Sequence, residues 1–193
     1  MSINLLETVQ QNLGYPQLQK IDPNTQQMVE DDNTPAEHKF SQAALPAILM
    51  GLYKYVMTDA GADEFLQGDN ATNWLKNIFP DNKKEAIETI SSYAKQSGDD
   101  PIAKLKAIVT ETIKVVKTNL AADAGAKEVK DFFSNQRNNI LPYLPAALNM
   151  GELLHDSTMD DNTNKMEGPV SSLMHKIGSA FSKPVMDEEF KKA

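Results

Sequence analysis

Cysteine is absent from the 193 residues of this chain, which excludes disulfide bonds and thiolate metal sites. A chain without cysteine is compatible with a reducing compartment. Basic residues are in the minority, because 19 lysines and arginines stand against 27 acidic residues and give a formal net charge of −8. An acidic surface repels nucleic acids and anionic lipid headgroups, so we expect no nucleic-acid partner.

Long hydrophobic runs are also missing. The longest apolar stretch covers residues 43–52, about half of the roughly 20 residues that a membrane-spanning helix needs. The first residues include Glu7 and no cluster of positive charge, a pattern that does not fit a secretory signal. We therefore expect a cytoplasmic protein without a membrane span.

Motifs for covalent or phosphate chemistry are lacking as well. Glycine occurs singly at nine positions, and the chain has neither a glycine-rich phosphate loop nor a Gly-x-Ser-x-Gly motif. The serines considered as nucleophiles lie within expected helices rather than on sharp turns. The sequence thus offers no candidate catalytic or cofactor-binding residue, and it favours a non-enzymatic protein.

Helical periodicity is the main feature that the sequence does have. Apolar residues recur three and four positions apart, whereas strand alternation and hairpin turns are scarce. The expected fold is all-α, an irregular multihelical array. Its expected helices cover residues 3–12, 34–58, 62–66, 70–79, 81–97, 100–120, 127–141, 143–155 and 169–181, with Gly14 ending the first.

The expected helix over residues 34–58 differs from the others because its apolar stretch has no polar face. Such a helix belongs at the centre of a fold, with other helices around it. Thr34 is a candidate cap, Pro35 suits the first helical turn, and Pro46 lies inside the helix. Because an interior proline removes one backbone hydrogen bond, we expect a kink or break there.

Two segments of the chain resemble each other. Residues 45–51 read Leu-Pro-Ala-Ile-Leu-Met-Gly, and residues 144–151 read Leu-Pro-Ala-Ala-Leu-Asn-Met-Gly. Each segment has an alanine and a glycine four positions apart, and small residues on one helix face allow another backbone to approach closely. The similarity is explained either by an internal duplication or by chance in an alanine- and leucine-rich protein. Both segments should be buried.

The length favours one all-α domain over residues 1–182, followed by a charged tail over residues 183–193. A division of this domain into residues 1–120 and 121–182 stays open.

The segment from Phe40 to Leu52, Phe-Ser-x-Ala-Ala-Leu-Pro-Ala-Ile-Leu-x-Gly-Leu, resembles a segment shared by the YidB-like group, also called DUF937. These are bacterial helical proteins without an established function. The resemblance covers residues 3–120, although the chain lacks a glycine-rich stretch found in the group. It implies a multihelical fold and no known catalytic residues.

One candidate metal site is the acidic stretch over residues 156–167, which has the length of a calcium-binding loop. Asp156, Asp160, Asn162 and Glu167 could supply oxygen ligands at the spacing that Ca²⁺ requires. The sixth position of such a loop is normally glycine, but here it is Asp161. A solvated acidic loop between helices is the competing interpretation.

A second candidate metal site is formed by Glu152 and His155. Residues three apart on a helix face the same way, so both side chains could bind one metal ion. Only one such motif is present, and a histidine near a helix end also has a structural explanation, since the helix dipole favours it there.

Two hypotheses about function follow. The first is a non-enzymatic protein-interaction or structural module that binds a protein partner or associates with itself. The second is a helical protein that binds a small ligand or Ca²⁺. The densest basic stretch, which contains Lys104, Lys106, Lys114 and Lys117, is expected to be a solvated helix face rather than a binding patch.

Overall fold

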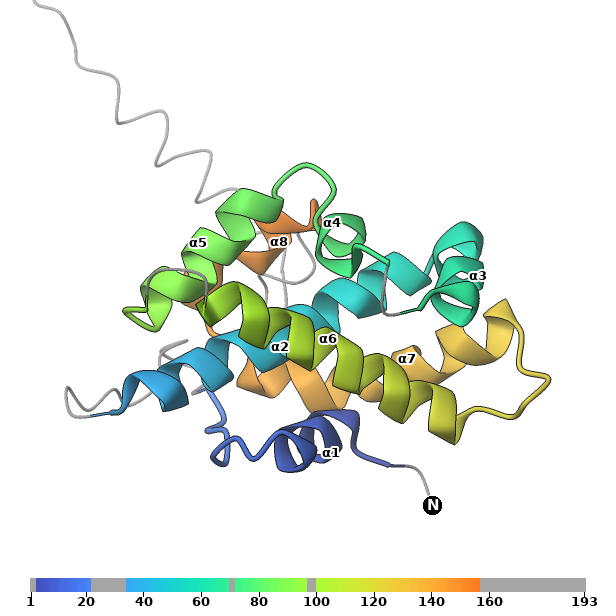
Figure 1. Cartoon of the computed structure of the whole chain (residues 1–193), viewed down its shortest axis with the longest axis horizontal. Coiled ribbons are helices and arrows are strands. Elements are labelled where there is room, and N and C mark those ends of the chain that lie inside the picture. The colour runs from blue at the N-terminus through green and yellow to red at the C-terminus, as the bar shows by residue number, and fades with distance from the viewer. Residues whose placement is uncertain (1–2, 22–33, 70–71, 97–99, 157–193) are drawn as a thin grey trace, which may run out of the picture. The chain divides into compact units, whose positions relative to one another are not determined.

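The computed structural model describes residues 3–21, 34–69, 72–96 and 100–156, which all belong to one unit spanning residues 1–163. These residues form an all-α fold without any strand (Figure 1). The expected helix over residues 169–181 and the charged tail lie outside the described residues. The helices are α1 (Leu5–Asn12), α2 (Ala36–Val56), α3 (Asp59–Gln67), α4 (Trp74–Ile78), α5 (Lys83–Tyr93), α6 (Asp100–Asn119), α7 (Ala126–Ile140) and α8 (Met150–Leu153), with short 3₁₀ helices η1 (Leu141–Tyr143) and η2 (Ala146–Leu148) between α7 and α8.

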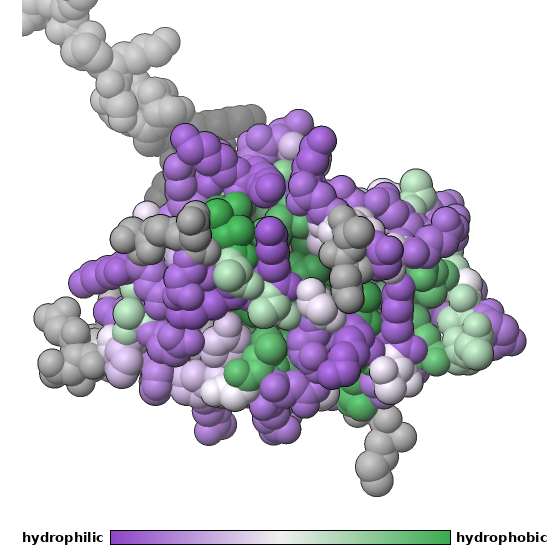
Figure 2. Space-filling view, viewed as in Figure 1, coloured by the Kyte–Doolittle hydropathy of each residue, from purple (hydrophilic) through white to green (hydrophobic). Residues whose placement is uncertain are grey.

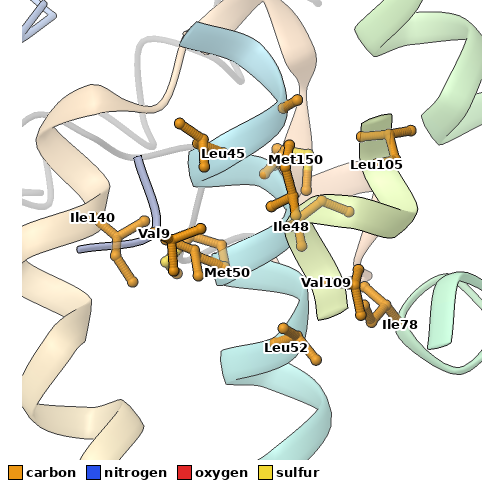
Figure 3. Close-up of a cluster of buried hydrophobic side chains, with 14 of the residues drawn as sticks. Val9, Leu45, Ile48, Met50, Leu52, Ile78, Leu105, Val109, Ile140 and Met150 are labelled. Atoms are coloured by element: carbon orange, nitrogen blue, oxygen red, sulfur yellow. The ribbon is translucent and has the colours of Figure 1, made fainter. Parts of the chain in front are cut away.

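Helix α2 is buried around its whole circumference. Every residue from Lys39 to Leu52 is buried, and the helix contacts α1, α3, α4, α5, α6, α7 and η1. Figure 3 shows side chains of α1 and α7 on one side of α2, and side chains of α4 and α6 on the other. The core of this part of the chain is therefore built around one helix. No helix among the described residues has the length and apolar character needed to cross a bilayer.

The start and the interior of α2 differ from expectation in two details. The residue that caps the helix is Pro35, and no side chain supplies a capping hydrogen bond, so Thr34 does not act as the cap. The helix runs through Pro46 without a break, and the kink stays a prediction. A proline can stay inside a long helix when packing on all sides compensates for the one hydrogen bond it removes.

The predicted stop of α1 at Gly14 is confirmed. Gly14 has a φ of +69°, a left-handed conformation that glycine adopts without a steric penalty. Its N–H donates to the carbonyl of Gln11, and the N–H of Tyr15 donates to the carbonyl of Gln10. These two hydrogen bonds are the Schellman arrangement that satisfies the last carbonyls of a helix.

Two buried glutamines fasten irregular segments to the core. The side chain of Gln136 in α7 accepts from the N–H of Leu5 at 2.9 Å and donates to the carbonyl of Ile3 at 3.0 Å. In α2, the side chain of Gln42 accepts from the N–H of Gln19 and donates to the carbonyls of Gln19 and Tyr143, at 2.8–3.0 Å. Each side chain thus satisfies backbone groups that have no helical partner.

The second of the two similar segments does not form the helix expected over residues 143–155. It consists of η1, η2 and the four-residue α8, and Asn149 adopts a left-handed conformation with a φ of +47°. Pro142 and Pro145 lie three residues apart, and each disfavours helical geometry at the residue before it. The segment is also less buried than expected, because Ala147 is exposed.

In the first segment, Gly51 lies against a side chain of α4, and the crossing of two backbones at the small residues stays a prediction. Gly51 of α2 is buried against α4, and a Cβ atom placed on it would lie 2.2 Å from Cγ2 of Ile78. This distance is far below van der Waals contact, so α4 packs where it does because residue 51 has no side chain.

Replacement of Gly51 by alanine should therefore lower the free energy of unfolding by about 1–3 kcal/mol, the usual cost of overpacking a core. Urea denaturation of Gly51→Ala, Ile78→Ala and the double variant would measure it. The truncation of Ile78 removes the methyl group that the new Cβ meets, so the double variant should lose less than the sum of the two single losses. Strict additivity would contradict this account of the contact.

Replacement of Gln42 by leucine should lower the free energy of unfolding by about 1–3 kcal/mol, because partly buried backbone groups of Gln19 and Tyr143 lose their partner. Urea denaturation measures the loss, and hydrogen exchange should show faster exchange of the Gln19 amide. Gln67→Leu, at an exposed position in α3, is the matched control and should change stability little. A Gln19 amide that stays protected in Gln42→Leu would count against the proposed fastening.

Candidate functional site

The C-terminal end of α2 lies beside α3, α4 and the residues that follow α8, and these elements enclose a hollow of about 600 Å³. We call it the apolar hollow, because its wall is mainly apolar. Ile78, Leu153 and Leu154 are buried side chains of this wall, whereas Pro80 is exposed. The residues that line it are Lys54, Tyr55, Thr58, Glu64, Lys76, Asn77, Ile78, Pro80, Asp81, Leu153, Leu154 and His155.

Three polar residues of this lining are hydrogen-bonded to one another. The hydroxyl of Tyr55 donates to one carboxylate oxygen of Glu64, and the amide of Asn77 donates to the other oxygen at 2.6 Å. The three residues come from α2, α3 and α4, so the network joins the elements that form the wall. Because these polar groups are already hydrogen-bonded to one another, a molecule bound in the hollow does not need to supply hydrogen bonds to them.

The environment of Tyr55 keeps its hydroxyl protonated. Partial burial raises the pKa of Tyr55 from its ordinary 10.0 to about 12, and the hydrogen bond and negative charge of Glu64 act in the same direction. Tyr55 is therefore a neutral donor at physiological pH, which suits a structural role at the wall.

At the opposite end of the hollow, Lys54 of α2 holds the chain that leaves α8. Its ammonium group donates to the backbone carbonyl of His155 at 2.8 Å and lies 3.7 Å from the carboxylate of Asp156. The side chain of Lys54 is only 34% exposed, so this contact is partly shielded from solvent. It fixes the position of Leu153 and Leu154 in the wall, because they directly precede the bonded carbonyl.

The candidate pair Glu152 and His155 lies beside this hollow, but not on one regular helix. Helix α8 ends at Leu153, and His155 has a φ of +52°. Both side chains are exposed, and no group of three or more possible metal ligands occurs among the described residues. The metal role of this pair stays a prediction.

The calcium loop falls mostly beyond the part of the chain that the structure describes. Asp156 is its first residue, and it is described and partly buried next to Lys54. Asp160, Asn162 and Glu167 lie outside the described residues, so the Ca²⁺ site also stays a prediction.

Sequence reasoning did not find the apolar hollow. Its wall combines residues 54–58, 76–81 and 153–155, which are separated by long stretches of chain and are brought together only by packing around α2. No spacing in the sequence indicates such a meeting.

The raised pKa of Tyr55 leads to a pH-dependent stability. Unfolded protein releases this proton near pH 10, whereas folded protein holds it up to about pH 12, so the contribution of Tyr55 is present below pH 10 and is lost as the pH rises toward 12. Burial also raises the pKa of Tyr15, so absorbance titration at alkaline pH should show a late step of tyrosine ionisation that Tyr55→Phe reduces. Tyr53→Phe, two residues away, is the matched control.

Replacement of Glu64 by glutamine should move the same step toward pH 10, because the negative charge that opposes ionisation of Tyr55 is gone. Late ionisation of undiminished amplitude in Tyr55→Phe would contradict the network, because only the contribution of Tyr15 should remain.

Comparison of the chain with protein-family models, with curated proteins and with solved structures finds no match. The resemblance of residues 40–52 to the YidB-like group therefore stays a prediction. The geometry of the described residues is the basis on which a function can be argued.

Proposed function

We propose that the protein is a non-enzymatic interaction module that associates with a second copy of itself through the apolar hollow. The observation that carries the proposal is the apolar hollow itself, whose wall includes the buried Ile78, Leu153 and Leu154 and the exposed Pro80, and whose lining also contains charged residues. An apolar centre with a polar rim is the usual anatomy of a protein–protein interface.

The charges on the rim favour a second copy over an unrelated partner. The chain carries a net charge of −8, so two copies repel each other at long range. The lining of the hollow has two lysines, Lys54 and Lys76, and two acidic residues, Glu64 and Asp81. This face is locally neutral, so its own charges add no repulsion between two copies.

A two-fold axis through the hollow would pair opposite charges. In a symmetric dimer, a contact between residue A of one copy and residue B of the other occurs twice. Lys76 and Asp81 are both exposed on the rim, and neither has an ion-pair partner among the described residues. We therefore propose that Lys76 of one copy forms an ion pair with Asp81 of the other copy across the two-fold axis.

The second hypothesis, a small-ligand or Ca²⁺-binding protein, is supported by the size of the hollow alone. Its volume of about 600 Å³ lies within the range of small-molecule sites. We also propose that the protein is located in the cytoplasm, whichever of the two functions it has. The lack of cysteine supports this location.

Sedimentation velocity from micromolar to millimolar concentration tests the proposal. The wild-type protein should show a monomer–dimer equilibrium, and Lys76→Glu or Asp81→Lys alone should weaken it roughly tenfold by placing like charges together. The swapped double variant, K76E/D81K, should recover dimerisation. Lys127→Glu, which makes the same charge change on an exposed residue of α7 outside the hollow, is the matched control.

A mixture of the two single variants gives the sharper result. A homodimer of either single variant places like charges opposite each other. In a heterodimer of Lys76→Glu with Asp81→Lys, residues 76 and 81 have opposite charges at both contacts. The equimolar mixture should therefore dimerise as well as wild type. The proposed interface would be refuted by a wild-type protein that stays monomeric at every concentration tested. It would also be refuted by a mixture that dimerises no more strongly than either single variant.

A further inference from the structure

A second hollow lies on the surface between α4, α5 and α6, and we call it the lysine groove. It has a volume of about 470 Å³ and is separate from the residues that line the apolar hollow. Figure 2 shows hydrophobic side chains at its bottom, between hydrophilic residues of α5 and α6. The residues that line it are Thr72, Asn73, Trp74, Leu75, Lys83, Ile87, Ile102, Lys106, Val109 and Thr110.

The floor of the lysine groove is apolar and is only partly covered. Val109 and Leu75 are 2% exposed, whereas Ile87 of α5 and Ile102 of α6 are only half-buried. Ile102, Lys106 and Val109 lie four and three residues apart, so one face of α6 supplies both floor and charge. An apolar group placed here would complete the burial of Ile87 and Ile102, which is favourable in proportion to the area removed from water.

The charges of the lysine groove are opposite in sign to those of the protein as a whole. Lys83 and Lys106 line it, and none of its described lining residues is acidic. In a chain with 27 acidic and 19 basic residues, such a surface is a local reversal of the overall charge. Cations over an apolar floor complement a ligand that has a negative head and an apolar body.

The other lysines of α6 show why Lys106 differs. Lys104 lies 3.0 Å from Glu37 and 2.8 Å from Asp100, and Lys114 pairs with Glu111. Lys117 donates to the backbone carbonyls of Leu66 and Gly68. These lysines of α6 are thus held by separate contacts. Within the described residues, the ammonium groups of Lys83 and Lys106 form neither an ion pair nor a hydrogen bond.

We propose that the lysine groove binds a small amphipathic carboxylate, with the carboxylate between Lys83 and Lys106 and the aliphatic chain on Ile87, Ile102 and Val109. The volume of the groove is in the range of small-molecule sites, which favours a short aliphatic acid over a protein segment. The site rests on a face of the molecule different from that of the proposed dimer, so either one can fail without the other.

The chain contains a natural reporter for this site. Trp74 is its single tryptophan and lines the groove. A bromine atom quenches indole fluorescence only at short range, so ω-bromooctanoate seated on the floor should quench Trp74. Quenching of the full-length protein should saturate, and unlabelled octanoate should reverse it.

Matched lysine variants then test the role of charge. K83Q/K106Q should weaken ω-bromooctanoate binding roughly tenfold, since two cations near the carboxylate are lost. K84Q/K114Q removes the same charge from the same two helices at residues outside the groove and should change binding less than twofold. The neutral analogue ω-bromooctanol should bind wild type and K83Q/K106Q alike, and circular dichroism should verify that both variants are folded.

Three results would overturn the proposal. They are the absence of saturable quenching below the concentration at which octanoate forms micelles, equal weakening by the two lysine pairs, and binding of ω-bromooctanol as tight as that of the acid. The last result would leave an apolar surface without selection for an anion.

Discussion

Burial of α2 on all sides is the constraint on which the rest of the described fold depends. A helix with an apolar residue at every angle has no face that can stay in water, so it must be surrounded. Two long helices, α6 and α7, cannot enclose it alone, and α1, α3, α4, α5 and η1 supply the remaining contacts.

The short helix α4 links this packing requirement to both proposed sites. Gly51 lets Ile78 approach α2, which positions the five residues of α4. Trp74 and Leu75 then form part of the lysine groove, while Asn77 and Ile78 form part of the apolar hollow. Surface hollows arise on both sides of α4, because a helix of this length cannot fill the space beside longer neighbours. The same local feature therefore accounts for stability and for two candidate binding surfaces.

Much of the helical pattern was predictable, because it depends on residues close together in sequence. The 3,4 spacing of apolar residues placed α6 and α7 within one or two residues, and Gly14 marked the end of α1. The prediction failed over residues 143–155, where two prolines and a left-handed Asn149 replace one helix with three short pieces. Pro46 and Pro145 occur in similar sequences, yet only Pro46 lies within a helix long and buried enough to retain it.

The candidate sites were beyond prediction for a different reason. The metal candidates were found by spacing, and spacing is a local property, whereas the two hollows are made by residues from distant parts of the chain. The lysines of α6 show the same limit. Their sequence indicated one basic face, but their partners Glu37, Leu66 and Gly68 come from other elements. Which lysine remains available for a ligand is decided by tertiary contacts that no window of sequence contains.

The distribution of charge gives the two hollows different expected occupants. The chain as a whole carries a net charge of −8, whereas the lining of the apolar hollow is balanced in charge and that of the lysine groove is positive. The neutral rim of the apolar hollow removes repulsion between like molecules but attracts neither sign, which fits a partner with the same charges. The lysine groove attracts anions, yet the net negative charge of the chain opposes large polyanions. A small anion avoids that penalty because it fits within the groove, where the two lysines dominate the local field.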